Sequence, residues 1–278
     1  MKEMRDSTEA ARNGQELRAR MREEGYLLIR GVIDQELLGQ VRSDVLGTLH
    51  RAGWIAADGS LKPLVNGQED PRYWDGFAGV QAVESFHRMA FDSRLQAIMS
   101  ALAGPDVYPW PGKSPYIMWP EGMGGANTKP HQEGCRWSTD ILSTWVSLGQ
   151  TPVQQGGLAV LPETQSVGYL DDYGYGKFEF GPDWVTASFE PGDIVIFHNF
   201  TVHGSLRNQT DSLRLSCAFK WQSAGHPAPA EAALPVRYPQ VPDWDSLTAG
   251  WSSRRWVTPP PGATFLAVPP GQPVPSMS

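Results

Sequence analysis

The stretch FEPGDIVIFHNFTVHGSLRNQTDSLRLSCAFKW, residues 189–221, contains two segments with the residue types of β-strands, and turn residues separate them. The first, DIVIFH, is rich in β-branched and aromatic residues, and the second, LRLSCAFKW, alternates apolar with polar or small side chains. Successive side chains of a strand point to opposite faces. One face of the second segment is therefore apolar, and the other is formed by Arg214, Ser216, Ala218 and Lys220. The stretch predicts two strands, the second with one buried face.

Similar short segments precede this stretch from about residue 107 onwards. They read VYPW, SPYIMWP, STWVSLG, LAVLP and TASF, and Gly, Pro and Asn residues lie between them. Many short strands separated by turns are typical of an all-β sandwich or barrel, whereas an α/β fold would alternate strands with helices. The sequence has neither a P-loop nor a GxGxxG motif, so a nucleotide-binding fold has no support. We expect a β core over about 107–222.

The region before this core has the residue pattern of helices. Residues 8–24 predict a polar amphipathic helix, GYLLIRGVI (25–33) predicts a short strand, and residues 34–53 predict a helix that begins at Asp34. Residues 60–80 are rich in Gly, Pro and Asp and predict irregular structure, and residues 85–104 predict one or two helices that end at Gly104. We expect a single domain over 1–278, with a helical front end over about 8–104 and an extended Pro-rich C-terminal segment over about 223–278.

The overall composition narrows the classes of partner. The chain has 278 residues, of which 40% are hydrophobic, and this is enough to bury a core. Its net charge of −7, without a run of Lys and Arg residues, gives no electrostatic signature for nucleic acid or an anionic membrane. The N-terminus is charged and no window reaches the roughly 20 apolar residues that span a bilayer, so we expect a cytoplasmic protein with a small-molecule partner. Cys135 and Cys217 are too few for a disulfide framework, and we expect both to be unpaired.

The candidate metal ligands begin in KPHQEGCRW, residues 129–137. If this segment is extended, as Pro130 favours, His131 and Glu133 project from the same face. With His203 they supply two imidazoles and one carboxylate, the donor set of the facial triad that holds non-haem Fe(II). An H-x-E pair also occurs as an ordinary polar pair on a surface strand, so the spacing by itself leaves both interpretations open.

Arg214 also has two interpretations. On a surface strand it would belong to a solvated polar face. In a barrel whose apolar outer face is covered by helices it would point into the cavity, where a guanidinium suits a bidentate contact with a carboxylate. His198 lies five residues before His203, and that spacing puts the two on opposite faces of a continuous strand. The remaining histidines, for which we also expect packing or surface roles, are His50, His87 and His226.

Several separated motifs together resemble the phytanoyl-CoA dioxygenase family of Fe(II)- and 2-oxoglutarate-dependent oxygenases. They are the H-x-acid pair, TWVSLGQTPVQQGGLAVLPETQ (144–165) and the stretch 189–221, and the resemblance runs from REEGYLLIRGVID (22–34) to about residue 222. It implies that iron is held by His131, Glu133 and His203. It further implies that Arg214 binds the distal carboxylate of 2-oxoglutarate and that Ser205 assists it. Residues that the resemblance places along the cosubstrate pocket are Trp145, Tyr116 and Met118.

The chain departs from the usual family pattern at one ligand. The family usually has Asp where this chain has Glu133, and the longer side chain still offers the same hard oxygen donor. The resemblance implies a mainly β fold with flanking helices, a double-stranded β-helix (jelly roll, cupin-like) of about eight strands in which helices from the N-terminal third cover one sheet.

The resemblance also implies a reaction. The cofactors are Fe(II), 2-oxoglutarate as cosubstrate and O2, and the outcome is oxidation of a C–H bond, by default hydroxylation, with release of succinate and CO2. The aromatic and Pro residues of segments 61–82 and 107–120 favour a small, mostly apolar metabolite such as a natural-product intermediate, and we expect a monomer or homodimer. Two alternatives stay open: a His2Glu zinc hydrolase, which gives Arg214 no task, and a catalytically inactive jelly-roll protein that binds a small molecule.

Overall fold

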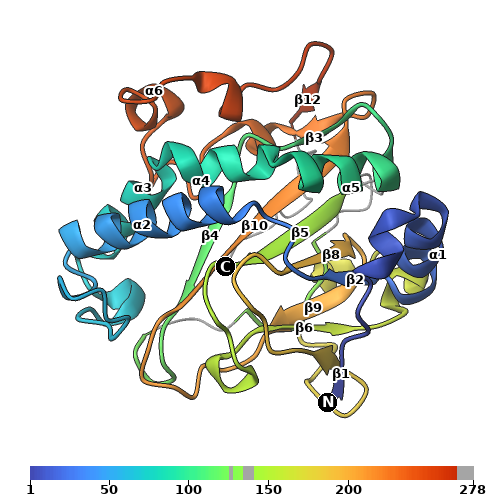
Figure 1. Ribbon diagram of the computed structural model, residues 1–278, viewed down its shortest axis with the longest axis horizontal. Coiled ribbons are helices and arrows are strands. Elements are labelled where there is room, and N and C mark those ends of the chain that lie inside the picture. The colour runs from blue at the N-terminus through green and yellow to red at the C-terminus, as the bar shows by residue number, and fades with distance from the viewer. Residues whose placement is uncertain (125–127, 134–140, 268–278) are drawn as a thin grey trace.

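Two β-sheets form the centre of the protein, and the computed structural model describes residues 1–124, 128–133 and 141–267. The larger sheet has the strand order β2 (Tyr26–Ile29), β8 (Ile194–His198), β5 (Leu142–Ser147), β10 (Arg214–Ser223) and β3 (Val107–Pro109), and β4 (Ser114–Met118) also pairs with β10. The smaller sheet has the order β1 (Lys2–Glu3), β7 (Val185–Thr186), β6 (Leu158–Leu161) and β9 (Val202–Ser205). The predicted double-stranded β-helix with flanking helices is confirmed (Figure 1).

The alternation in β10 divides the interior into two layers. The core cluster that includes the helices contains four residues of this strand and the residue before it, namely Leu215, Cys217, Phe219, Trp221 and Leu213. A second apolar cluster contains Tyr26, Trp145, Leu158 and Phe197 and lies between the two sheets. The polar face of β10 is turned toward this inner layer, because neighbouring residues of a strand face opposite ways. Cys217 is buried and unpaired, and Cys135 lies outside the described residues.

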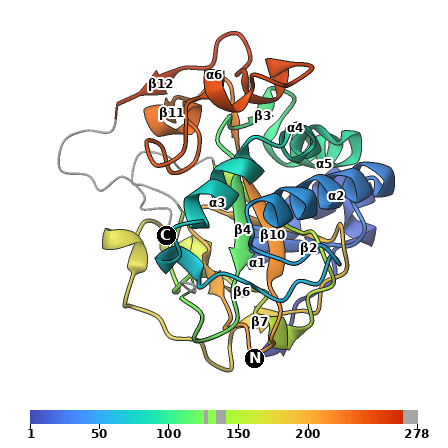
Figure 2. The ribbon, with the colours of Figure 1, turned by 90° about the vertical axis from the view of Figure 1, so that its left-hand side faces the viewer.

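Helices cover the outer face of the larger sheet. Their bounds are α1 (Gly14–Glu24), α2 (Gln35–Arg51), α3 (Tyr73–Gln81), α4 (Glu84–Arg88) and α5 (Ser93–Ala103). The helix predicted over 8–24 is divided, because the Asn13 side chain caps α1 and a 3-10 turn, η1 (Glu9–Arg12), precedes it. Asp34 caps α2 and Gly104 follows α5, as predicted. In Figure 2, α2, α4 and α5 lie on one side of β4 and β10.

The prediction of irregular structure over 60–80 is wrong for its last third, which forms α3. Glycine lowers helix propensity, and Gly76 and Gly79 made this segment look unfavourable for a helix. Their small size has a packing role instead. A Cβ at Gly76 would lie 2.2 Å from Cε2 of Trp54, and one at Gly79 would lie 2.7 Å from Cγ2 of Thr48. Close approach of α3 to Trp54 and to α2 therefore requires both glycines.

The C-terminal segment is also more ordered than its composition predicts. The Pro-rich residues after 223 form β11 (Ala228–Pro229), α6 (Trp244–Leu247) and β12 (Phe265–Leu266), which Figure 2 shows at one end of the larger sheet. The fully buried ammonium of Lys113 donates to the carbonyl oxygens of Trp110, Pro111 and Trp256 at 3.0, 3.3 and 2.8 Å. Burial of Trp256 and these bonds hold the segment on the core, so the prediction of an extended tail is wrong where these elements form. Residues 268–278 lie outside the described residues.

Short 3-10 turns connect the remaining elements. They are η2 (Gly67–Glu69), η3 (Met89–Phe91), η4 (Val153–Gln155), η5 (Thr164–Val167), η6 (Asp171–Gly174), η7 (Ala230–Ala233) and η8 (Arg254–Val257). Within the described ranges, no helix has both the length and the apolar composition needed to cross a membrane.

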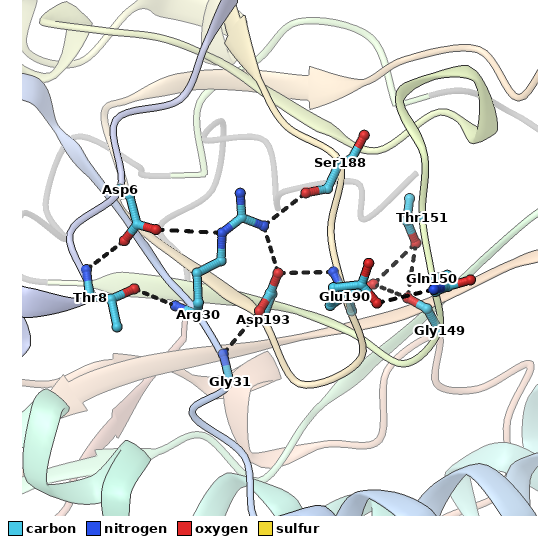
Figure 3. A network of polar contacts seen from close by, with 11 residues as sticks. Asp6, Thr8, Arg30, Gly31, Gly149, Gln150, Thr151, Ser188, Glu190 and Asp193 are labelled. Carbon is cyan, nitrogen blue, oxygen red and sulfur yellow. Dashed lines mark hydrogen bonds and ion pairs between the residues drawn. The ribbon is translucent and has the colours of Figure 1, made fainter.

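A polar network fastens β2 to the turn before β8 (Figure 3). The buried carboxylate of Asp193 accepts from Nη1 of Arg30 at 2.6 Å and from the backbone N–H groups of Gly31 and Glu190, both at 2.9 Å. Nη1 of Arg30 also donates to the Ser188 carbonyl at 2.8 Å. These bonds join the end of β2, an edge strand, to the turn before β8. They therefore fix the position of this edge of the larger sheet.

Candidate metal centre

His131 and His203 are brought together by backbone pairing. The N–H of His131 donates to the carbonyl of His203 at 2.9 Å, and the N–H of His203 donates back at 3.0 Å. His203 lies in β9, where it also pairs with Val160 of β6. The two imidazole rings have centroids 4.3 Å apart. Neighbouring strand positions therefore place the two rings side by side.

Glu133 joins the histidines because residues 131–133 are extended, as Pro130 predicts. Between them, Gln132 points the other way, and its side chain bonds to Gly168, Leu170 and Phe200. Oε1 of Glu133 lies 3.4 Å from Nε2 of His203 and 3.8 Å from Nε2 of His131. The three residues offer one ligand atom each within 4.8 Å of one another.

Each imidazole uses its Nδ1 atom for a hydrogen bond to the backbone. The Nε2 atom, which faces Glu133, is left available for a metal. Nδ1 of His131 is 2.8 Å from the carbonyl of Lys129, and Nδ1 of His203 is 3.0 Å from the carbonyl of Thr201. A carbonyl oxygen only accepts, so each Nδ1 donates, and each Nε2 is the ring nitrogen directed at Glu133. Burial lowers the pKa of His203, and nearby His131 lowers it further, which favours the neutral ligand form.

Lys220 holds the second oxygen of Glu133. Its Nζ lies 2.7 Å from Oε2, and both side chains are 12% exposed. Burial alone raises the pKa of the Glu133 carboxyl, but the charge of Lys220 and the contacts with both histidines outweigh it, so the pKa lies well below its ordinary value. The carboxylate is therefore charged, with Oε2 on the lysine and Oε1 directed at the two Nε2 atoms.

A small cavity surrounds the three candidate ligands. Its other lining residues include Tyr116, Trp145, Leu158, Phe197 and Ser205. The ring of Tyr175 stacks on His131 at 5.2 Å, and the ring of Phe197 lies 4.3 Å from that of His203. The structure thus brings the predicted residues Trp145, Ser205 and Tyr116 into one cavity with the candidate ligands.

Arg214 lies beside this cavity, in a second one that we call the aromatic chamber. Its side chain is buried, and its guanidinium carbon is 5.6 Å from the ring of Trp145. Met118, which pairs with Arg214 across the strands, lines the chamber, and Tyr116 and Thr128 line both cavities. Arg214 therefore lines the neighbouring cavity and not the one around the candidate ligands, and the two cavities share Tyr116 and Thr128.

Only one bond of the Arg214 guanidinium is made within the described protein. Nη1 donates to the carbonyl of Gly156 at 2.5 Å, whereas Nε and Nη2 find no acceptor among the residues that the structure describes. Burial lowers the pKa of Arg214 to about 10, so it stays charged at neutral pH. A buried cation with free N–H groups is costly unless an anion binds there.

Other histidines lie away from the cluster. His198 ends β8, and its Nδ1 accepts from the N–H of Phe200 at 3.1 Å. Two contributors were missed by the sequence interpretation. Lys220 was placed on the inward face of β10, but nothing in the spacing indicates that it meets Glu133. Tyr175 follows η6, which has no periodic pattern, so no sequence signal points to its stacking on His131.

A known protein family matches most of the chain. The family model of phytanoyl-CoA dioxygenase (PhyH) matches residues 21–216, which include all three candidate ligands and Arg214. The chain belongs to the phytanoyl-CoA dioxygenase family. Membership places it among the Fe(II)- and 2-oxoglutarate-dependent dioxygenases, as the resemblance predicted.

Two relatives with known activities are similar to part of the chain. The 1-deoxypentalenic acid 11-beta-hydroxylases of Streptomyces exfoliatus and Streptomyces arenae are 27% and 26% identical to the chain over 214 residues, which is 67% of this chain and 72% of each relative. Among solved structures, EctD from S. alaskensis with bound Fe has a TM-score of 0.61 at 16% identity. The match covers 96% of this chain and 91% of the EctD chain.

A second solved structure shows the same fold. The non-heme alpha ketoglutarate dependent epimerase SnoN from nogalamycin biosynthesis has a TM-score of 0.58 at 23% identity, and the match covers 76% of this chain and 84% of SnoN.

Two features of this phytanoyl-CoA dioxygenase family member fit the family's metal and cosubstrate. Two imidazoles and one carboxylate are the donor set that non-haem Fe(II) prefers. The free N–H groups of Arg214 suit a carboxylate that approaches in bidentate fashion. Glu133 takes the place of the usual Asp without loss of reach, because its Oε1 faces both histidines.

Proposed function

We propose that the protein uses Fe(II), 2-oxoglutarate and O2 to hydroxylate a C–H bond of a small, mostly apolar molecule, with release of succinate and CO2. Iron would be held by His131, Glu133 and His203, and the distal carboxylate of 2-oxoglutarate by Arg214 with assistance from Ser205. When bound, the iron supplies the redox chemistry that activates O2.

The observation that carries the proposal is the state of Arg214. Its guanidinium is charged and buried, and two of its nitrogens have no acceptor in the described protein. A zinc hydrolase with the same three ligands would have no use for such a cation. A dicarboxylic cosubstrate that chelates the metal through one end leaves its other carboxylate for this arginine, and a charge-assisted bidentate contact offsets the cost of burying it.

The chain's own residues would position and shield the reaction. The Nδ1–H bonds to the Lys129 and Thr201 carbonyls fix the orientation of both imidazoles, and Lys220 fixes the rotation of the Glu133 carboxylate. The rings of Tyr175, Phe197 and Trp145 pack around the centre and limit the access of water.

The aromatic chamber would accept the substrate. The rings of Trp54, Tyr73, Phe77 and Trp119 form its wall, with centroid distances between 4.7 and 6.0 Å for neighbouring rings. Such a wall favours a molecule with an apolar body. The hydroxylases that act on 1-deoxypentalenic acid and the nogalamycin enzyme SnoN support a natural-product intermediate as the substrate class.

An anaerobic titration tests the proposal without a known substrate. Addition of Fe(II) and then 2-oxoglutarate to the purified protein is expected to produce the weak visible charge-transfer band of the chelate, and admission of O2 should release succinate. A protein that binds Zn(II) and hydrolyses esters without forming this band would be the hydrolase. A protein that forms no band and releases no succinate would be an inactive binding protein.

A further inference from the structure

The aromatic chamber contains a second guanidinium. Arg237 lines it together with Arg214, and no Asp or Glu is found among the described residues that line this chamber. Burial raises the pKa of the Tyr73 and Tyr116 hydroxyls, and the charge of Arg237 opposes that rise at both, so it lies near each of them. The chamber therefore combines apolar rings with two positive charges that lack a counter-ion.

Arg237 has a conformation that the protein must enforce. Its φ is +69°, in the left-handed region that is unfavourable for a residue with a side chain. The backbone around it is firmly held, because Val236 and Val241 belong to the main core and the N–H of Val241 donates to the carbonyl of Arg237 at 3.1 Å. The backbone therefore fixes the direction in which the Cα–Cβ bond of Arg237 leaves the chain.

The side chain of Arg237 is half-buried, and within the described ranges no hydrogen bond or ion pair of its guanidinium is found. Other arginines in the C-terminal segment differ. Arg254 pairs with Asp245 at 2.7 Å, and Arg255 lies 3.9 Å from the ring of Trp256. Arg237 is thus placed for a partner that the described residues do not provide.

We propose that Arg237 is the anion-binding residue for the substrate, and that the substrate is an apolar molecule with a carboxylate. This inference rests on the proposed function, in which 2-oxoglutarate occupies Arg214 and leaves Arg237 as the second cation. A carboxylate on Arg237 and an apolar body against Trp54 and Trp119 would hold one end of the substrate away from the metal. Specificity would follow, because an uncharged analogue leaves the guanidinium without a partner.

Matched pairs of ligands test this assignment. The probes are adamantane-1-carboxylic acid, cyclohexanecarboxylic acid and 1-decalincarboxylic acid, each compared with its primary amide by calorimetry on the anaerobic Fe(II)–2-oxoglutarate complex. At neutral pH the wild-type protein should bind at least one acid roughly tenfold more tightly than its amide, the range of one charge-assisted contact. In R237Q this preference should disappear, and in R237K part of it should remain.

The controls separate this proposal from the proposed function. R255Q, outside the chamber, should keep the wild-type preference for the acid. The 2-oxoglutarate affinity of R237Q, measured by the charge-transfer band, should equal that of wild type. Equal binding of acids and amides to wild type, no binding of any acid, or weakened 2-oxoglutarate binding in R237Q overturns the assignment. Failure of wild type to form the band overturns the proposed function instead.

Discussion

Arg30 and Arg214 both lie on strands or strand ends of the larger sheet, but their guanidinium groups have different partners. Arg30 is met by the buried carboxylate of Asp193 and the Ser188 carbonyl, and Asp193 also accepts two backbone N–H groups (Figure 3). Arg214 is more deeply buried, yet two of its nitrogens have no acceptor in the described protein. The described residues satisfy the polar groups of the first region and leave two nitrogens of the second without an acceptor.

This difference separates residues that hold the fold from residues that hold a ligand. A buried polar group that the protein satisfies contributes to stability, and its loss should be measured as unfolding. A buried polar group left without partners costs free energy, and its loss should be measured as weaker ligand binding. Substitutions in the two regions should therefore affect different measurements, and each variant below tests whether they do.

The largest effect is expected at the candidate ligands. In H203A, Fe(II) affinity should fall by more than about 100-fold, because loss of a residue that only supports a metal ligand already costs about 10- to 100-fold. Succinate release should fall below detection, while the circular dichroism spectrum stays native. H198A is the control, since His198 lies away from the cluster, and it should keep Fe(II) affinity and turnover. Equal Fe(II) affinity in H203A and wild type would contradict the assignment.

The next effect is expected at Arg214. R214M keeps much of the side-chain volume and removes the charge, so 2-oxoglutarate binding should weaken by about 2–5 kcal/mol, or roughly 30- to 4,000-fold. Fe(II) affinity should change little. The free energy of unfolding, measured by urea, should stay near that of wild type, because removal of an unpaired buried charge offsets the lost bond to Gly156. A large loss of stability with unchanged 2-oxoglutarate affinity would place Arg214 with Arg30.

Local geometry predicted which side chains share a face, whereas the pairing that brings His203 to His131 joins distant positions and was implied by the resemblance. An extended segment after Pro130 directs His131 and Glu133 the same way, and the alternation of β10 turns Arg214 away from the helices. These are consequences of strand periodicity and need no knowledge of distant contacts. The roles of these residues in catalysis stay predictions until the variants are measured.

Features that depend on contacts between distant segments were not predictable. Helix α3 was missed because Gly76 and Gly79 lower helix propensity, and only their packing against Trp54 and Thr48 shows why they are there. The contact of Lys220 with Glu133 joins positions 87 residues apart in the sequence and depends on the register of β10. Arg237 lies in the Pro-rich segment after residue 223, for which the composition predicted an extended structure.

A smaller effect, on stability alone, is expected in the network of Arg30. D193A removes the acceptor for Arg30, Gly31 and Glu190, and should lower the free energy of unfolding by about 2–4 kcal/mol. D193N keeps an acceptor oxygen and should lose less. Both variants, when folded, should bind 2-oxoglutarate with wild-type affinity. Weaker 2-oxoglutarate binding in folded D193A, with stability unchanged, would remove the distinction between the two regions.

Lys220 shares one feature with Arg30 and one with Arg214. Its partner is a protein carboxylate, as for Arg30, but that carboxylate belongs to Glu133, a candidate metal ligand. The ammonium holds Oε2 of Glu133 at 2.7 Å and leaves Oε1 directed at the histidines. In K220M the carboxylate is free to rotate, so Fe(II) affinity should fall by about 10- to 100-fold, the usual cost of losing a residue that orients a ligand. K220R keeps a donor and should recover part of the affinity.

The effect of Lys220 should depend on the length of its partner, and a double substitution measures this. In E133D the shorter side chain withdraws Oε2 from Lys220, so we expect weaker Fe(II) binding than in wild type but measurable succinate release. Since E133D already loses the contact, the further change K220M should cost much less Fe(II) affinity there than in wild type. Equal costs in the two backgrounds would mean that Lys220 acts on the metal through its charge alone. A rise in Fe(II) affinity in K220M would mean that Lys220 competes with the metal for Glu133 rather than orienting it.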